Sequence, residues 1–495
     1  MSLSETDRTR LEVSARMSGP DKARLGQFLT PSVIAQFMAA LFTESHTSHC
    51  RLLDAGAGIG SLSAAFLERC ATGELRFEEV EVDAFEIDLG LHPYLARTLN
   101  AYKERVNVDP NVRGGDFIEA AVRELSNDLF ADNLPRYTHT ILNPPYKKIR
   151  SSSTYRTALR RVGIETVNLY SAFVALSLSL LDNHGQLVAI IPRSFCNGPY
   201  YKPFREYILE RSTIRHLHLF ESRKNAFRDD HVLQENIIIM LERGAVQGDV
   251  VISTSTASSF KDIVRHTHRI ESILVPDDRE RFIHIPTSPD CISIEPPLFC
   301  SSLHDIGIEV STGPVVDFRL RDHLRSMPGP GTVPLLYPGH LKGQGTEWPK
   351  PGSRKPNAIC RNADTEKWFF PMGFYCAVRR FSSKEERRRI MASVVQPSGF
   401  IGADLLAFEN HLNVFHECKH GLPEALAHGL AVFLNSTVVD EHFRRFNGHT
   451  QVNAADLRQM KYPNRRALIA LGKWAMGCGE LTQELIDDHL NRLAA

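Results

Sequence analysis

The sequence predicts an α/β fold of the Rossmann-like type, with a mostly parallel, seven-stranded sheet in its first half. Three observations support this prediction: apolar strand-like runs alternate with helical patterns, the first run leads into a glycine-rich turn, and a later run ends in a proline-rich tetrapeptide. Ligands of such sheets bind at the carboxyl ends of the strands, where the turn and the tetrapeptide both fall. The predicted strands are 51–54, 82–86, 105–108, 138–142, 186–191, 214–219 and 236–241.

The glycine-rich turn follows the first strand and reads Gly56-Ala57-Gly58-Ile59-Gly60. Glycine at these positions allows a nucleotide-like ligand to approach the backbone closely. The next strand ends at Glu86, where a carboxylate suits a pair of ribose hydroxyls, and Asp88 is the alternative. A plain strand-to-helix turn beside a surface acid is the other interpretation. The predicted nucleotide ligands are Asp54, Ala55, Gly56, Gly58, Gly60, Glu86 and Ile87.

The tetrapeptide Asn143-Pro144-Pro145-Tyr146 follows the strand 138–142. The side-chain oxygen of Asn143 and the carbonyl of Pro144 offer two acceptors for the two N–H groups of a planar amine, and the prolines fix φ without adding a donor. Stacking on Tyr146 would contribute roughly 1–3 kcal/mol, comparable to the few kcal/mol needed to extrude a base from a duplex. A Pro-Pro turn that merely closes a strand is the alternative, so the neighbouring motifs must decide.

Taken together, the motifs resemble the gamma-class adenine-N6 DNA methyltransferases of bacterial restriction-modification systems, which carry Asn-Pro-Pro-Tyr and use S-adenosylmethionine. The resemblance includes a class I methyltransferase fold, and the second half of the chain resembles enzymes paired with endonucleases of the BsuBI/PstI type. The further segments that carry the resemblance are Gly26 to Pro31, Gly115 to Phe117, Asn168 to Tyr170, Gly185 to Pro192, and Gly448 to Asn453 with Asp456 and Leu457.

The resemblance also implies roles for residues that the pattern alone does not assign. The segment with Thr30 would close over the methionine part of the cofactor, while Asp116 would bind the amino group of its adenine and Phe117 would lie against the ring. The family's catalytic loop implies that Asn143 also borders the cofactor. A second aromatic residue, Phe227 or alternatively Phe220, would complete a sandwich around the target base.

The implied activity is methyl transfer from S-adenosylmethionine to N6 of an adenine flipped out of duplex DNA, which would protect the site from a separate, cognate restriction endonuclease. The catalytic residues would be Asn143, Pro144, Pro145 and Tyr146. Two alternatives remain open. The same loop suits another planar nitrogen, in RNA or a protein glutamine, and an inactive DNA specificity subunit could retain the fold.

The 58 basic and 58 acidic residues give a formal net charge of zero. Binding to DNA therefore requires that the basic residues gather on one surface and the acidic residues lie elsewhere. We predict DNA contacts from Lys147, Lys148 and Arg150, directly after the tetrapeptide, with Arg156, Arg160 and Arg161 in the same cluster. A second cluster lies in the other half, where solvated helix faces are the common explanation of such runs. Its members are Arg379, Arg380, Lys384, Arg387, Arg388 and Arg389.

The sequence texture changes after residue 243 to short β-rich stretches punctuated by Pro and Gly. We therefore predict a flexible N-terminus over 1–24, a catalytic domain over 25–246 and a target-recognition domain over 247–495. The last domain should mix α and β structure. Its predicted helices are 423–434, 438–446 and 481–493.

The nine cysteines form no CxxC pair, and no apolar run reaches the roughly 18 residues of a membrane helix, so we expect a reduced, cytoplasmic setting without membrane attachment. Four residues of the second half invite a zinc interpretation. Their spacing matches no closed four-ligand pattern, and we predict no metal. They are His411, His416, Cys418 and His420.

Overall fold

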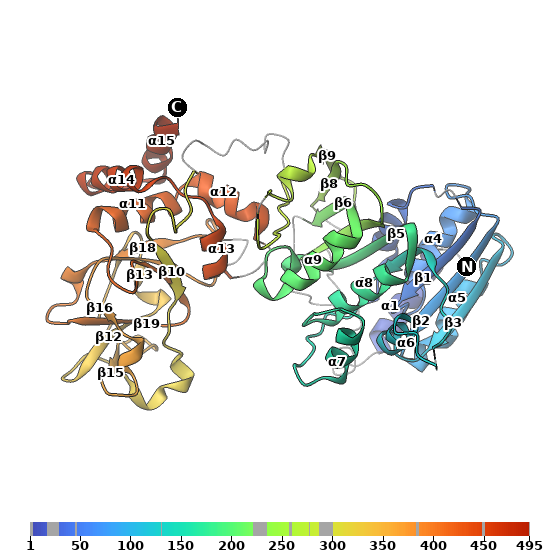
Figure 1. The fold of residues 1–495 in the computed structure, drawn as a ribbon, viewed down its shortest axis with the longest axis horizontal. Helices are drawn as coiled ribbons and strands as arrows, with labels where there is room; N and C mark the ends of the chain where they lie inside the picture. The colour runs from blue at the N-terminus through green and yellow to red at the C-terminus, as the bar shows by residue number, and fades with distance from the viewer. Residues whose placement is uncertain are drawn as a thin grey trace. The chain divides into compact units, whose positions relative to one another are not determined.

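The computed structural model divides the chain into two compact units, Met1–Ile292 and Ser293–Ala495 (Figure 1). Each unit has its own sheets and its own apolar clusters. The residues that the structure describes are 3–16, 29–44, 47–129, 131–220, 235–256, 260–276, 278–286, 300–382, 386–447 and 451–494.

The first unit is built on a nine-stranded sheet with the order β3-β2-β1-β4-β5-β7-β6-β8-β9. The pairs β5–β7, β6–β7 and β8–β9 are antiparallel and the other pairs are parallel, which confirms the predicted α/β class. The sheet has two strands more than predicted, because β8 pairs with β6 and β9 pairs with β8. The strands are β1 His49–Ala55, β2 Glu79–Glu86, β3 Val108–Gly114, β4 Tyr137–Leu142, β5 Leu181–Pro192, β6 Ser212–Phe220, β7 Asn236–Arg243, β8 Val250–Ser255 and β9 Val264–His268.

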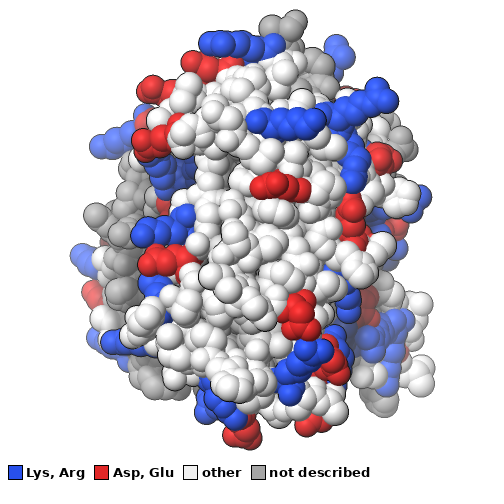
Figure 2. Space-filling model, turned by 90° about the vertical axis from the view of Figure 1, so that its left-hand side faces the viewer, with Lys and Arg blue, Asp and Glu red and all other residues white. Residues whose placement is uncertain are grey.

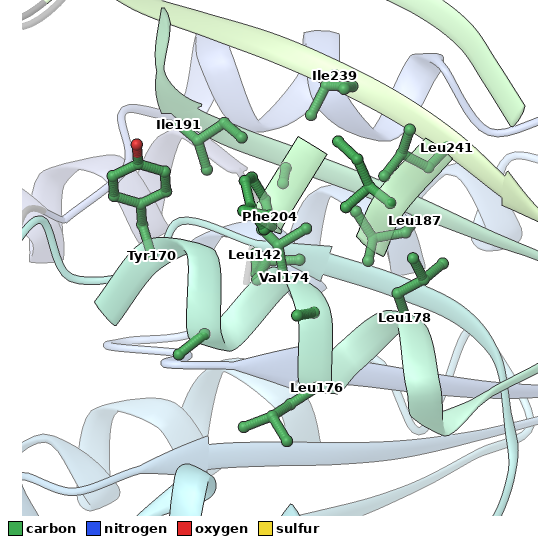
Figure 3. Close-up of a cluster of buried hydrophobic side chains, with 14 of the residues drawn as sticks. Leu142, Tyr170, Val174, Leu176, Leu178, Leu187, Ile191, Phe204, Ile239 and Leu241 are labelled. Atoms are coloured by element: carbon green, nitrogen blue, oxygen red, sulfur yellow. The ribbon is translucent and has the colours of Figure 1, made fainter. Parts of the chain in front are cut away.

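Helices cover both faces of this sheet (Figure 1). Residues of α3, α4 and α5 form one apolar cluster with one face, and residues of α6, α7, α8 and α9 form another with the opposite face. In Figure 3, Val174 and Leu178 of α8 lie against Leu187 and other strand residues. The helices are α1 Leu3–Arg16, α3 Ser32–Ala40, α4 Ser61–Ala71, α5 His92–Asn100, α6 Phe117–Leu125, α7 Thr154–Arg161, α8 Leu169–Leu180 and α9 Lys202–Arg211.

Two predicted boundaries need correction. The first unit continues past residue 246, because β8 and β9 belong to its sheet. Much of the N-terminus predicted to be flexible is the helix α1, whose Val13 packs with Leu29, Ile59 and Leu91. The carboxylate of Asp7 also accepts a hydrogen bond from the backbone of Ser32, 3.0 Å away, and so ties α1 to the start of α3.

The third strand was predicted too early in the chain. The prediction covered 105–108, whereas β3 spans Val108–Gly114 and contains Asp109, Pro110 and Asn111. These residues suppress the apolar signal of a strand. They are tolerated because β3 is an edge strand, where one side of the backbone needs no partner strand.

The second unit mixes α and β structure, as predicted. It contains a four-stranded sheet β10-β20-β17-β18, a five-stranded sheet β11-β15-β12-β19-β16 and the hairpin β13-β14. The strands are β10 Glu309–Thr312, β11 Leu324–Arg325, β12 Thr332–Leu336, β13 Leu341–Lys342, β14 Gly345–Thr346, β15 Ala358–Cys360, β16 Phe370–Pro371, β17 Tyr375–Arg379, β18 Ala392–Val395, β19 Leu405–Phe408 and β20 Leu412–His416.

Helices follow these sheets in the chain, and two of them, α13 and α14, were not predicted. Helix α14 packs closely on α11, because glycine stands at both contact points. A Cβ at Gly472 would lie 1.7 Å from the carbonyl oxygen of Ala425, and one at Gly429 would lie 1.9 Å from that of Leu468. No helix in the described ranges combines the length and the hydropathy needed to span a membrane. The helices are α11 Glu424–Leu434, α12 Thr437–Phe446, α13 Ala454–Gln459, α14 Arg465–Gly477 and α15 Gln483–Ala494.

Candidate active site

A cavity of about 360 Å³ opens at the carboxyl edge of the first unit's sheet. It is bordered by the glycine turn after β1, the end of β2, the start of α6 and the loop after β4. Residues that are far apart in the sequence therefore meet in one place, as the strand order requires. The predicted site residues that line the cavity are Gly56, Gly58, Glu86, Ile87, Asp116, Phe117, Asn143, Pro145 and Lys147.

The glycine turn leaves room for a ligand against the backbone. Gly56 and Gly58 have φ values of +86° and +59°, in the left-handed region that favours glycine. A Cβ at Gly58 would also lie 2.9 Å from Cδ2 of Leu29, another residue of the cavity wall. The turn therefore needs glycine for its conformation and for the space beside it.

The carboxylate of Glu86 is held in a fixed orientation at the end of β2. Its Oε2 accepts a hydrogen bond from the backbone of Gly58 at 2.8 Å, and its Oε1 accepts one from the backbone of Asp88 at 2.8 Å. Burial raises the pKa of Glu86, while these two hydrogen bonds lower it. Asp88 itself accepts from the backbone of Gly90. Of the two predicted ribose ligands, Glu86 is the one that lines the cavity.

Three predicted ligands at the two ends of the turn do not line the cavity. Asp54 is fully buried, and its Oδ2 accepts a hydrogen bond from Ser63 at 2.6 Å. Burial raises the pKa of Asp54 to about 7. Ala55 is buried in the core, and Gly60 precedes α4 with a φ of +85°. These residues shape the turn and are not among the residues that line the cavity.

Asp116, another residue of the cavity wall, caps the N-terminus of α6. Its Oδ1 accepts hydrogen bonds from the backbones of Ile118 and Glu119, at 2.8 and 3.2 Å. Its Oδ2 accepts a hydrogen bond from the hydroxyl of Tyr155, a cavity residue on α7 that sequence reasoning missed. No motif marks Tyr155, because its partner is far away in the chain.

The wall beside Asp116 is aromatic. Phe117 is buried, and its ring lies edge-on to Phe85 at 5.3 Å between centroids and tilted to Phe173 at 5.1 Å. Phe85 and Phe173 also line the cavity and were not predicted. Flat apolar surface beside a fixed carboxylate suits a heteroaromatic ring that carries an amino group.

The loop after β4 brings Asn143 to the same cavity, with its amide oriented by two neighbours. Its Nδ2 donates to Oγ1 of Thr30 at 3.0 Å, and the hydroxyl of Tyr146 lies 3.1 Å from its Oδ1. The same hydroxyl lies 3.1 Å from the carbonyl oxygen of Ile190, and burial raises the pKa of Tyr146 well above its usual value. Thr30 is buried and positions Asn143, but it is not among the cavity-lining residues.

The aromatic partner of Tyr146 cannot be assigned among the described residues. Phe227 lies outside them. The alternative, Phe220, is 2% exposed and packs in the core against His218 and Phe260. In this structure, Phe220 is a core residue rather than an exposed platform.

The basic residues after the catalytic loop fall into two groups. Lys148 and Arg150 are exposed, and Lys147 is exposed at the cavity wall. Arg156 and Arg160 instead form ion pairs with Glu165, whose carboxylate offsets part of their positive charge. The second group therefore contributes less positive potential than the sequence suggests.

The basic cluster of the second unit is largely bonded within that unit. Arg379 donates to the carbonyl of Leu341, and Arg380 donates to that of Asn410. Arg388 donates to Thr437, and Arg389, which is 1% exposed, donates to Asn447. Lys384 lies outside the described residues, and Arg387 is exposed. On the face of this unit shown in Figure 2, basic and acidic side chains are interspersed around an uncharged centre.

The histidines that invited a zinc interpretation have other partners. His411 bonds to the buried carboxylate of Glu409, and His416 bonds to Ser311. Within the described ranges, no group of three or more His, Cys, Asp or Glu side chains is arranged to hold a metal ion.

The α/β sheet with a cavity at its carboxyl edge agrees with the methyltransferase class that the sequence resembles. Residues 128–227 match the family described as Eco57I restriction-modification methylase. The chain is 51% identical over 495 residues to the type II methyltransferase M.BsuBI of Bacillus subtilis, covering 99% of this chain and 98% of the relative. It is 41% identical over 480 residues to M.PstI of Providencia stuartii, covering 95% and 93%.

The chain therefore belongs to the type II methyltransferases of restriction-modification systems. A solved structure, the DrdV–DNA complex, has the same kind of fold, with a TM-score of 0.53 and 13% identity over 93% of this chain and 58% of that one.

Proposed function

We propose that the protein is a site-specific DNA methyltransferase that acts on N6 of an adenine swung out of duplex DNA. The observation that carries the proposal is the shared cavity: the glycine turn and Asn143 border the same space. The acceptor predicted for the amine is thus next to the region predicted for the methyl donor.

The residues present fit S-adenosylmethionine. Gly56 and Gly58 line the cavity without a side chain, Glu86 offers a fixed carboxylate for ribose hydroxyls, and Asp116 with Phe117 offers an acceptor beside an aromatic wall. When bound, the cofactor supplies a methyl group on a positively charged sulfur. Ile87, which is 51% exposed, offers an apolar surface for the other face of the adenine.

The loop after β4 would hold the amine of the target base. The amino nitrogen of adenine shares its lone pair with the ring, so it becomes nucleophilic only when that lone pair is drawn out of conjugation by acceptors on its two N–H groups. Oδ1 of Asn143 and the carbonyl of Pro144 would accept from them. The bond from Asn143 to Thr30 fixes which amide atom is the acceptor, so little reorganisation is needed during the reaction.

Tyr146 would stack on the extruded base. Its hydroxyl proton lies between two acceptors, Oδ1 of Asn143 and the carbonyl of Ile190 on β5, which keeps the ring close to the acceptor pair. Once the nitrogen is alkylated it is cationic and strongly acidic, so its proton can leave to water. Catalysis therefore rests on positioning and on fixed acceptors rather than on a titrating base.

The biological role proposed here is protection of a recognition site from a separate, cognate endonuclease in the cytoplasm. The second unit would read the site, with Lys148 and Arg150 of the first unit on the phosphates. The full-length similarity to two type II methyltransferases supports this role.

The test is sequencing of the DNA of a host that expresses the chain, by a method that detects methylated adenine. We expect N6-methyladenine at one short recognition sequence, and none with an empty vector. Transfer of labelled methyl to RNA or to protein instead would support the same chemistry on another planar nitrogen. Absence of transfer to any of the three, with cofactor binding intact, would contradict the proposal.

A further inference from the structure

Tyr155 lies in the cofactor cavity although it comes from a helix that carries no family motif. It is in the first turn of α7, whose N-cap is Ser153. Its hydroxyl donates a hydrogen bond to Oδ2 of Asp116, and its side chain lines the cavity with Asp116 and Phe117. The hydroxyl is thus placed at the end of the cavity proposed for the cofactor's adenine.

The hydrogen bond from Tyr155 completes the fixation of the Asp116 carboxylate. Oδ1 already accepts the two backbone N–H groups at the start of α6. A carboxylate has about four lone-pair positions, so Oδ2 can accept a second hydrogen bond beside that of Tyr155. With both oxygens anchored, the carboxylate cannot rotate to suit a different ligand.

The position of Tyr155 is itself rigid. Leu159, one turn further along α7, is fully buried in the core. Arg156 and Arg160 both pair with Glu165 and so hold the helix to the segment before α8. Because packing and ion pairs fix α7, Tyr155 can hold the Asp116 carboxylate in one orientation.

We propose that Tyr155 is a positioning residue that sets the base selectivity of the cofactor site. It fixes Asp116 as a pure acceptor, so that a purine with a 6-amino group is bound and a purine with a 6-oxo group is rejected. The inference rests on the proposed role of Asp116 toward the cofactor's adenine. The physical reason for rejection is that an oxo group facing a carboxylate leaves both groups without a donor.

The test compares the binding of two ligands by calorimetry: S-adenosylhomocysteine and its 6-oxo analogue, S-inosylhomocysteine. We expect Tyr155→Phe to weaken the first by about fivefold or more, the equivalent of one net hydrogen bond, while the affinity for the second changes little. The ratio of the dissociation constant of S-inosylhomocysteine to that of S-adenosylhomocysteine should therefore fall. Tyr102→Phe is a matched control, because its hydroxyl bonds to the Glu68 carboxylate at 3.0 Å outside the cavity lining, and it should leave the ratio unchanged.

Two results would overturn the inference. Equal weakening of both ligands would show that Tyr155 has only a structural role, and an unchanged ratio would show that its hydroxyl has no influence on selectivity. Asp116→Asn separates this inference from the assignment on which it rests. If Asp116→Asn leaves the ratio unchanged, the proposed role of Asp116 is wrong. If Asp116→Asn lowers the ratio and Tyr155→Phe does not, only the proposed role of Tyr155 is wrong.

The double variant tests whether the two residues act together. In the Asp116→Asn background, Tyr155→Phe should cause no further change in the ratio.

Discussion

The two units of this protein use their polar residues in different ways. In the first unit, polar groups from four distant segments border one cavity, as Gly58, Glu86, Asp116 and Asn143 show. In the second unit, most of the described arginines of the basic cluster donate to acceptors inside the unit. The contrast teaches that a run of charge in a sequence does not identify a binding surface, whereas the backbone motifs at the strand ends do lie together on one cavity.

Substitutions in the two units should therefore have different effects. Changes in the cavity of the first unit should alter binding or turnover and leave the fold intact, because the groups concerned border open space. Changes to the internally bonded arginines of the second unit should alter stability first, because they leave acceptors inside the unit without donors.

Asn143→Ala should lower the rate of methyl transfer by about 10²–10³-fold, the loss typical of removing one fixed partner of the reacting group. The measurement is single-turnover transfer of labelled methyl to duplex DNA. The affinity for S-adenosylhomocysteine, measured in parallel, should stay close to that of the wild type. A variant that methylates DNA at nearly the wild-type rate would contradict the acceptor role of Asn143.

Arg389→Ala should destabilise the second unit by about 1–3 kcal/mol, because it leaves the buried side-chain oxygen of Asn447 without the donor that Arg389 supplies. The measurement is the free energy of unfolding in urea. Arg387→Ala is the matched control: this neighbour is exposed, and its removal should change the free energy of unfolding by less than about 0.5 kcal/mol. Equal effects of the two substitutions would remove the distinction between internal and surface arginines.

Gly58→Ala should weaken the binding of S-adenosylhomocysteine by about tenfold, because a methyl group narrows the cradle and strains a left-handed residue by about 1 kcal/mol or more. Calorimetric titration measures the effect. At Gly73, φ is +75° and a Cβ would meet no atom within 4 Å, so Gly73→Ala isolates the backbone strain. Unchanged cofactor affinity in Gly58→Ala would show that the turn does not hold the cofactor.

Lys148→Ala should weaken binding to duplex DNA by only a few-fold and should reduce the slope of log K against log salt by about 1. Arg160→Ala should have a smaller effect on the slope, because Arg160 is already paired with Glu165. Fluorescence anisotropy at several salt concentrations measures both. If Arg160→Ala reduced the slope more than Lys148→Ala, the proposal that Lys148 rather than Arg160 contacts the phosphates would be wrong.

The prediction of the fold succeeded where the pattern was local and failed where pairing was remote. The apolar runs that became β1, β2, β4, β5, β6 and β7 were identified because buried strands need continuous apolar residues. The edge strand β3 was displaced, because an edge strand can carry polar residues and Pro110. Strands β8 and β9 were left out of the sheet, because the pairing of β8 with β6 and of β9 with β8 is a tertiary contact that no local pattern records.

By itself, the sequence was enough to predict the chemistry proposed here: the glycine turn, Glu86 and the Asn-Pro-Pro-Tyr loop can each be recognised in a short stretch, because backbone conformation and residue type act locally. Only the tertiary structure decided which side chains support them. Thr30 orients Asn143, Tyr155 fixes Asp116, and Asp54 bonds to Ser63 and does not line the cavity. These relations depend on which strands and helices become neighbours, and that is settled by packing over the whole unit rather than by any one segment.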